Sequence, residues 1–261
     1  MTLDYLGHLG SESARFLSVL RAADLSDRVP SCPDWDGADL LWHLGEVQWF
    51  WGSIVAERRS SADGLDSPSR PDSDHGLVQF FEEQSARLHH ALTEADPAEA
   101  VYTWSDDKTV GFIRRRQAHE ALIHRLDAEL TVGDVTSLDT DLASDGVLEV
   151  LDVMYGGEVE WGTFTPAGVQ AEVRTTDTGL SVPVALGRFT GTDPDDGTSY
   201  DDDELSVRKA DEGVEPSVVV SGRADDLDAW LWHRRDDSPI TFEGDAAVIE
   251  RLRRTLDQPI T

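Results

Sequence analysis

The sequence predicts an α+β protein: a four-helix bundle over residues 1–138, followed by a small α/β domain over residues 139–261. Three observations lead to this prediction. Four long segments of the first half repeat hydrophobic residues at helical spacing. The second half contains short segments that alternate in polarity or run hydrophobic between turn residues, as strands do. A length of 261 residues suits one large domain or two ordinary ones.

Helical periodicity places the bundle helices at about residues 3–23, 36–59, 77–95 and 109–130. Asp36 suits the N-cap of the second helix, and Asp39 adds a negative charge near its positive end. Gly133 is a natural stop after the fourth helix. Polar segments rich in Gly, Pro and Ser separate the helices, and residues 101–104 are predicted to be a short extended piece. Four amphipathic helices joined in this way favour a four-helix bundle.

The second domain is predicted to begin with a helix over residues 141–155. Val169–Thr175 and Leu180–Leu186 alternate in polarity and flank Thr176–Gly179, which predicts a β-hairpin. The acidic stretch Thr192–Glu204 is predicted to be a solvated loop, because its Asp and Gly residues do not match the spacing of an EF-hand calcium loop. The remaining elements are expected to be strands at 216–221 and 240–242 and helices at 225–233 and 245–256.

The chain carries a net charge of −30 and a single cysteine. Such an acidic surface repels nucleic-acid phosphates, so we expect no nucleic-acid partner. The charge fits a salt-adapted organism or a GC-rich genome, and it keeps a protein soluble. One cysteine excludes a disulfide within the chain. Because no signal peptide and no membrane-spanning apolar run is visible, we expect a cytoplasmic protein without a membrane partner, compatible with a monomer.

Glu120 and His124 lie four residues apart in the fourth predicted helix, so their side chains share one helix face. A carboxylate and an imidazole on one face can bind a divalent metal ion, although this spacing is also common on solvated faces. The zinc-protease pattern His-Glu-x-x-His is absent, because the residue four after His119 is Ile123. His43, in the second helix, is either a core histidine or a third ligand. With it, two facing helices would supply three ligands.

Two further motifs contain residue types that often carry chemistry. Cys32 lies in a turn between Pro30 and Pro33. A buried, unreactive role is favoured over a catalytic thiol, because the sequence shows no obvious base beside it. His89 and His90 are adjacent on a predicted helix and diverge by about 100°, so they cannot easily bind one metal ion together.

Three segments form a recognisable set in this order: Val29–Trp35 (VPSCPDW) with Asp39–Val47 (DLLWHLGEV), then Arg116–Glu129 (RQAHEALIHRLDAE), then Ser221–Trp232 (SGRADDLDAWLW) followed by Gly244 and Asp245. In composition, order and spacing they resemble the N-terminal signature, the second signature and the C-terminal domain of the mycothiol-dependent maleylpyruvate isomerase family. The resemblance covers nearly the whole chain.

The resemblance implies a DinB-like bundle with a divalent metal ion, usually zinc, at its centre. The family's metal-binding histidine of the second helix corresponds to His43, and the Glu and His of its fourth helix correspond to Glu120 and His124. One position departs from the family, because many members have a second histidine where this sequence has Gln48. Three protein ligands leave zinc an open position, which is typical of catalytic sites.

The resemblance also implies a reaction with mycothiol or another small thiol as co-substrate. A metal-bound thiol becomes a thiolate at neutral pH. The thiolate would add to the double bond of an unsaturated dicarboxylate such as maleylpyruvate, and elimination after bond rotation would release the trans isomer. Without elimination, the same site would be a thiol S-transferase. A zinc-hydroxide hydrolase and a non-catalytic metal-binding or regulatory bundle are the alternatives.

The sequence defines the roles of residues other than the three ligands less clearly. Asp127 and Arg125 lie close to His124 in sequence and are candidates for supporting roles or for surface ion pairs. Arg174 and Arg188 could bind a substrate carboxylate through two hydrogen bonds, but their spacing selects neither. The sequence assigns no catalytic residue beyond the metal site and no residue that binds the thiol.

Overall fold

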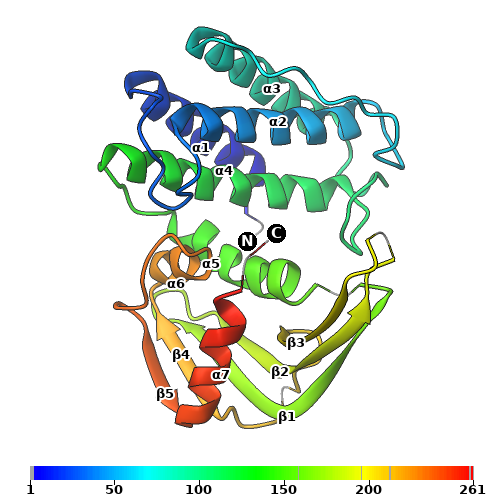
Figure 1. Cartoon of the computed structure of the whole chain (residues 1–261), viewed down its shortest axis with the longest axis vertical. Helices are drawn as coiled ribbons and strands as arrows, with labels where there is room; N and C mark the ends of the chain where they lie inside the picture. The colour runs from blue at the N-terminus through cyan, green and yellow to red at the C-terminus, as the bar shows by residue number, and fades with distance from the viewer. Residues whose placement is uncertain (1–2, 158, 195, 212, 259, 261) are drawn as a thin grey trace. The chain divides into compact units, whose positions relative to one another are not determined.

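The computed structural model describes residues 3–157, 159–194, 196–211, 213–258 and 260 (Figure 1). The chain divides into two compact units, Met1–Leu138 and Asp139–Thr261. Four long α-helices form the first unit, and a five-stranded sheet with further helices forms the second. The predicted α+β class, with a helical region before a strand-rich one, is therefore confirmed. None of the described helices is both long enough and apolar enough to cross a bilayer.

The helices of the first unit are α1 (Tyr5–Ala22), α2 (Gly37–Ala56), α3 (Asp74–Glu94) and α4 (Val110–Val132). The predicted start of α2 is confirmed, because Asp36 and Asp39 form a reciprocal capping box there. α4 ends at Gly133, whose φ of 70° suits a residue without a Cβ atom. Local signals in the sequence thus determine where α2 begins and where α4 ends, the two helices that carry the candidate site.

Close helix packing forms the interior of the first unit. Two glycines of α2 allow α3 to approach: an added Cβ atom would lie 3.1 Å from the Phe80 ring at Gly45 and 3.4 Å from the Leu88 backbone at Gly52. Phe16 of α1 is fully buried in the same core. Interiors packed this closely hold their side chains in fixed positions.

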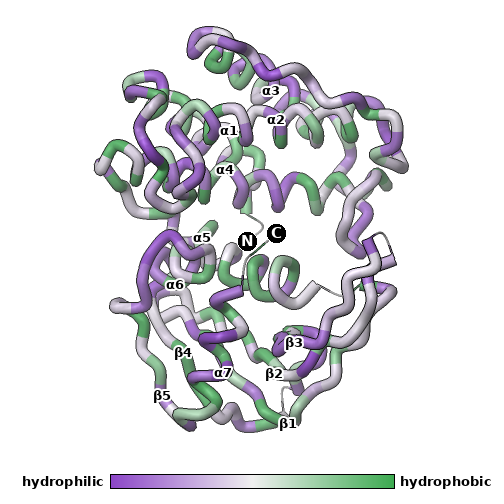
Figure 2. Tube along the Cα trace, viewed as in Figure 1, coloured by the Kyte–Doolittle hydropathy of each residue, from purple (hydrophilic) through white to green (hydrophobic). Residues whose placement is uncertain are grey.

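α4 is buried along most of its length although many residues in its middle are hydrophilic (Figure 2). Ion pairs make this possible. Glu129 accepts hydrogen bonds from Arg15 at 2.7 Å and from Arg125 at 2.9 Å. It also accepts the backbone N–H of Thr136 at 2.8 Å. Because buried charges are tolerated when they are paired and hydrogen-bonded, α4 can carry polar side chains inside the bundle.

The second unit begins with α5 (Thr140–Glu149), which continues as a π-helix, η1 (Val150–Tyr155). Its sheet has the order β3-β2-β1-β4-β5, in which only β1 and β4 are parallel neighbours among the described strands. The elements are β1 (Gly162–Thr175), β2 (Ser181–Thr192), β3 (Ser199–Ser206), β4 (Val218–Gly222), α6 (Ala224–Leu231), β5 (Thr241–Gly244) and α7 (Ala246–Leu256).

The prediction of a solvated loop over Thr192–Glu204 is wrong, because strand β3 begins at Ser199 within it. Side chains alternate between the two faces of a strand, so an acidic run can be accommodated when cations lie on one face. Arg188 lies opposite Asp203 in the register of β2 and β3, and it pairs with Asp201. This neutralisation from a neighbouring strand cannot be seen in the local sequence.

Three other predicted boundaries also differ. The first hairpin strand begins at Gly162 rather than at residue 169, and the aromatic rings around Trp161 extend the hairpin at that end. The helix predicted over residues 141–155 changes to π geometry at Val150. Residues 101–104, predicted to be a short extended piece, lie outside the named strands, next to an isolated bridge between Ala100 and Thr109.

Candidate metal centre

Three side chains from two helices of the first unit meet at one point: His43 of α2, and Glu120 and His124 of α4. One ligand atom of each lies within 4.8 Å of the other two. His124 Nε2 lies 3.1 Å from Glu120 Oε1, and His43 Nε2 lies 3.6 Å from the same oxygen. The three candidate ligands are therefore neighbours, with His124 buried and the other two partly buried.

Local structure in α4 and in the turn before α2 explains why these three side chains lie close together. Glu120 and His124 are one helical turn apart, so their side chains stack on one face of α4. The proline-containing turn before α2 brings the ring of Trp35 to 4.7 Å from that of His43, measured between ring centroids. The rings of His43 and His124 meet edge to face at 4.9 Å. The His43 imidazole is thus held between an indole and a second imidazole.

Asp127 fixes the orientation of the His124 ring. His124 Nδ1 lies 2.9 Å from Asp127 Oδ2, and Ser31 Oγ donates a hydrogen bond to Asp127 Oδ1 at 2.5 Å. A carboxylate on one ring nitrogen selects the tautomer and leaves the other nitrogen, here Nε2, for a metal ion. Sequence reasoning considered Asp127 but missed Ser31, which lies 96 positions away and has no local signal.

The charges in the site are arranged around Glu120. Burial favours its neutral form, but the Arg116 guanidinium, 2.5 Å from Oε2, and hydrogen bonds with both histidines hold the pKa of Glu120 well below its ordinary value. Burial also opposes protonation of His124, yet hydrogen bonds with Asp127 and Glu120 raise its pKa to about 9. In the metal-free protein a proton therefore occupies His124, where a metal ion would replace it.

The donor set fits a divalent cation. Two imidazole nitrogens and one carboxylate oxygen are the ligand types of catalytic zinc sites, where three protein ligands leave one position open. The low pKa of Glu120 keeps its carboxylate ionised, which supplies negative charge that such a cation needs. The orienting hydrogen bond on His124 is a further feature of metal-binding histidines.

The other candidate residues have different surroundings. Cys32 is partly buried at the edge of the bundle core, in agreement with the favoured packing role. Gln48 is fully buried and donates a hydrogen bond to Ser13 Oγ at 3.0 Å. The three candidate arginines form ion pairs with neighbouring carboxylates: Arg125 with Glu129, Arg174 with Glu172, and Arg188 with Asp201.

Comparison with known proteins agrees with the motifs. The mycothiol maleylpyruvate isomerase N-terminal domain family matches residues 6–129, a range that contains His43, Glu120 and His124. The similarity to this family extends over residues 6–129, just under half of the chain. The family resemblance inferred from the sequence motifs is thereby confirmed. No curated protein matches the chain.

Two crystal structures extend the fold comparison beyond the family domain. They are structures of the mycothiol-dependent maleylpyruvate isomerase and of a histidine-to-alanine mutant of that enzyme. Each superposes with a TM-score of 0.58 over 93% of both chains, at 15% and 14% sequence identity respectively. At this identity the similarity shows that both units share the fold of these structures.

Proposed function

We propose that the protein is a divalent-metal-dependent enzyme that activates a small thiol as a thiolate nucleophile. One observation carries the proposal: His43, Glu120 and His124 meet within 4.8 Å in a segment that matches the mycothiol maleylpyruvate isomerase N-terminal domain family. Zinc is the metal ion that this donor set favours. The partners of such an enzyme are small molecules, and the cytoplasm, where thiols stay reduced, is its proposed location.

Each residue of the site has a defined task in this proposal. A bound divalent cation supplies Lewis acidity that keeps a thiol deprotonated at neutral pH. His43 and His124 offer Nε2 atoms to the cation, and Glu120 offers a carboxylate oxygen. Asp127 keeps the His124 ring oriented through Nδ1. Arg116 keeps the Glu120 carboxylate ionised and positioned.

The substrates are proposed from the similar proteins. Both similar structures are described as mycothiol-dependent maleylpyruvate isomerase. Mycothiol or another small thiol would be the co-substrate, and an unsaturated dicarboxylate such as maleylpyruvate would be the electrophile. Addition of the thiolate converts the carbon–carbon double bond to a single bond that can rotate, and loss of the thiolate restores it as the trans isomer. Release of the adduct instead would make the protein an S-transferase.

The test is an assay of zinc-loaded protein with maleylpyruvate, with and without mycothiol. The proposal predicts turnover or adduct formation that requires both the thiol and the metal ion. His43→Ala should abolish this activity, whereas His90→Ala, at an exposed position of α3, should not. Thiol-independent hydrolysis would instead indicate a zinc-hydroxide enzyme. Stable metal binding without any activity towards thiols and electrophiles would indicate a regulatory protein.

A further inference from the structure

A second candidate site lies in the C-terminal unit and goes beyond the proposed function. A cavity of about 190 Å³ lies between the end of η1 and strands β1, β2 and β3. Its lining includes Gly156, Phe164, Phe189 and Glu204. Cavities for drug-sized ligands usually span roughly 300–1,000 Å³, so this one suits a smaller molecule.

Strand register places two aromatic rings and one carboxylate on the same face of the sheet. Phe164 of β1 is paired with Phe189 of β2, and Gly187 of β2 is paired with Glu204 of β3. Gly187 and Phe189 are two residues apart and therefore share a face. A Cβ atom at Gly187 would lie 2.4 Å from the Phe164 ring. The missing side chain thus lets this ring lie across the position next to Glu204.

The four consecutive acidic residues of β3 alternate between the two faces of the sheet. On the face away from the cavity, Asp201 pairs with Arg188, and Asp203 pairs with Arg251 at 2.8 Å. On the cavity face the situation differs. Among the residues that the structure describes, no Lys or Arg lies within ion-pair distance of Glu204 or of Asp202, which lies on the same face of β3.

Glu204 is partly buried, and its carboxylate accepts one hydrogen bond within the described chain, from the Leu205 N–H at 3.1 Å. Loss of hydration raises the pKa of Glu204 to about 7; the Leu205 N–H opposes this shift, and the Asp202 charge adds to it. Elsewhere the chain surrounds a buried carboxylate, Glu129, with arginines. Among the described residues, no cation pairs with the Glu204 carboxylate, and a ligand could supply this positive charge.

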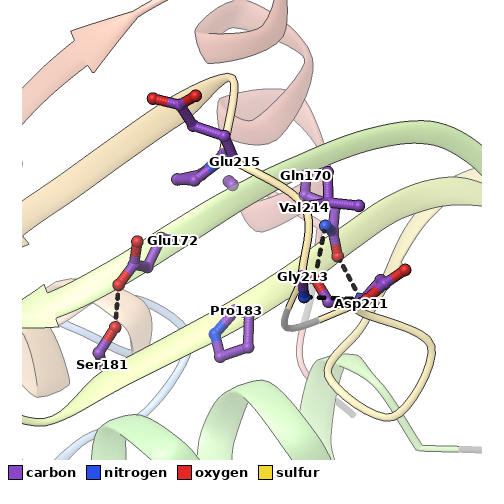
Figure 3. A pocket seen from close by; sticks show the side chains of 10 residues that line it. Gln170, Glu172, Ser181, Pro183, Asp211, Gly213, Val214 and Glu215 are labelled. Atoms are coloured by element: carbon purple, nitrogen blue, oxygen red, sulfur yellow. Dashed lines mark hydrogen bonds between the residues drawn. The ribbon is translucent and has the colours of Figure 1, made fainter.

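A larger cavity of about 520 Å³ in the same unit lacks this combination (Figure 3). One of the carboxylates that line it, Glu172, is already bound by Arg174 and by the hydroxyl of Ser181. The amide of Gln170 is bonded to the backbone of Asp211, and Figure 3 draws these bonds and the one between Glu172 and Ser181 as dashed lines. Glu172 is therefore a suitable control for Glu204.

We propose that the smaller cavity binds a small alkylammonium cation, with the Glu204 carboxylate as its counter-ion and the rings of Phe164 and Phe189 as its walls. A cation beside a carboxylate gains more Coulomb energy in a partly buried site than in water. Aromatic faces attract alkylammonium groups through their quadrupole. Lys209 also lines the cavity, but its side chain is exposed, and no ion pair joins it to Glu204 in the described part of the chain.

Three probes of nearly equal shape test the charge of the ligand: choline, its neutral analogue 3,3-dimethylbutan-1-ol, and the anion 3,3-dimethylbutanoate. Isothermal titration calorimetry at constant ionic strength should show choline binding at least about tenfold more tightly than the other two. Chelation of metal ions should leave this binding unchanged, which separates it from the proposed function. Preference for the anion, equal binding of all three, or no choline binding at millimolar concentrations would each overturn the proposal.

Matched variants locate the site. Glu204→Gln should weaken choline binding at least about tenfold, because it removes the charge but keeps an oxygen for the Leu205 N–H. Phe189→Leu should weaken it by a smaller factor through loss of the ring face. Glu172→Gln should have no effect. Thermal melting of each variant confirms that it is folded. Unchanged choline affinity in folded Glu204→Gln protein would place any binding elsewhere.

Discussion

His124 links the two parts of the candidate metal centre. Its Nε2 atom faces Glu120, and its Nδ1 atom faces Asp127, which Ser31 holds in turn. The first contact lies where a metal ion would bind, and the second sets the ring orientation. Because both contacts come from α4 itself, the orientation of the ring depends mainly on one helix and on the turn that contributes Ser31.

Asp127→Asn is expected to weaken divalent-metal binding roughly 10–100-fold, because the partner that orients a metal-bound histidine tunes its affinity to that extent. Titration of Zn²⁺ against a competing chelator measures the change. Asp134→Asn, at an exposed position just beyond α4, is the matched control and should bind zinc like the unmodified protein. Equal zinc affinity for the two variants would remove Asp127 from the site.

Glu204→Gln is expected to stabilise the protein at pH 8 and to have little effect at pH 4. Folding raises the pKa of Glu204 from its ordinary value of 4.5 to about 7, so the folded state holds this proton more strongly. The stability that comes from protonation of Glu204 is therefore fully present below pH 4.5 and is lost as the pH rises through 7. Urea unfolding should show a gain of about 1–2 kcal/mol at pH 8. An equal gain at both pH values would contradict this cause.

At the scale of elements, α4 serves two purposes. It carries Glu120 and His124, and it also binds α1 and the segment after its own end through ion pairs of Glu129. Removal of one partner from a buried ion pair leaves an uncompensated charge, which is more costly than the loss of an exposed pair. The ion pairs of α4 should therefore contribute to the stability of the bundle.

Glu129→Ala should lower the free energy of unfolding by about 3–5 kcal/mol, because it leaves Arg125, itself buried, without this partner. Glu82→Ala removes the exposed pair with Arg21 and should cost less than about 1 kcal/mol. Chemical denaturation of both variants provides the comparison. Similar losses for the two would show that the buried network adds nothing beyond surface pairing.

The sequence predicts those parts of the molecule that depend on local signals. The capping residues of α2 and Gly133 after α4 are read directly, and helical spacing alone brings Glu120 and His124 to one face. Features that depend on distant residues could not be predicted. The acidic run containing β3 needs Arg188 from another strand, and Ser31 reaches Asp127 only in the folded chain.

At the scale of the whole molecule, the net charge of −30 opposes the folded state through self-repulsion. There are 52 acidic residues but only 22 Lys or Arg residues, so many carboxylates have no Lys or Arg to pair with. Screening by salt shortens the range of repulsion from about 10 Å at 0.1 M to about 3 Å at 1 M. The stability of this protein should therefore depend on ionic strength.

Raising the NaCl concentration from about 0.1 M to about 1 M should increase the melting temperature, because it screens more repulsive than attractive pairs. Differential scanning calorimetry in both buffers measures this. Potassium chloride is the control, since simple screening predicts the same increase with either salt. A melting temperature that stays constant or falls with both salts would show that ion pairs outweigh the excess negative charge.

The central claim is that His43, Glu120 and His124 together bind one divalent metal ion. Elemental analysis of the purified protein, reconstituted with zinc and passed through a desalting column, tests this most directly. We predict about one zinc ion per chain for the unmodified protein and for His90→Ala, and almost none for His43→Ala or His124→Ala. Zinc content that stays at one per chain in His124→Ala would contradict the assignment of the metal centre.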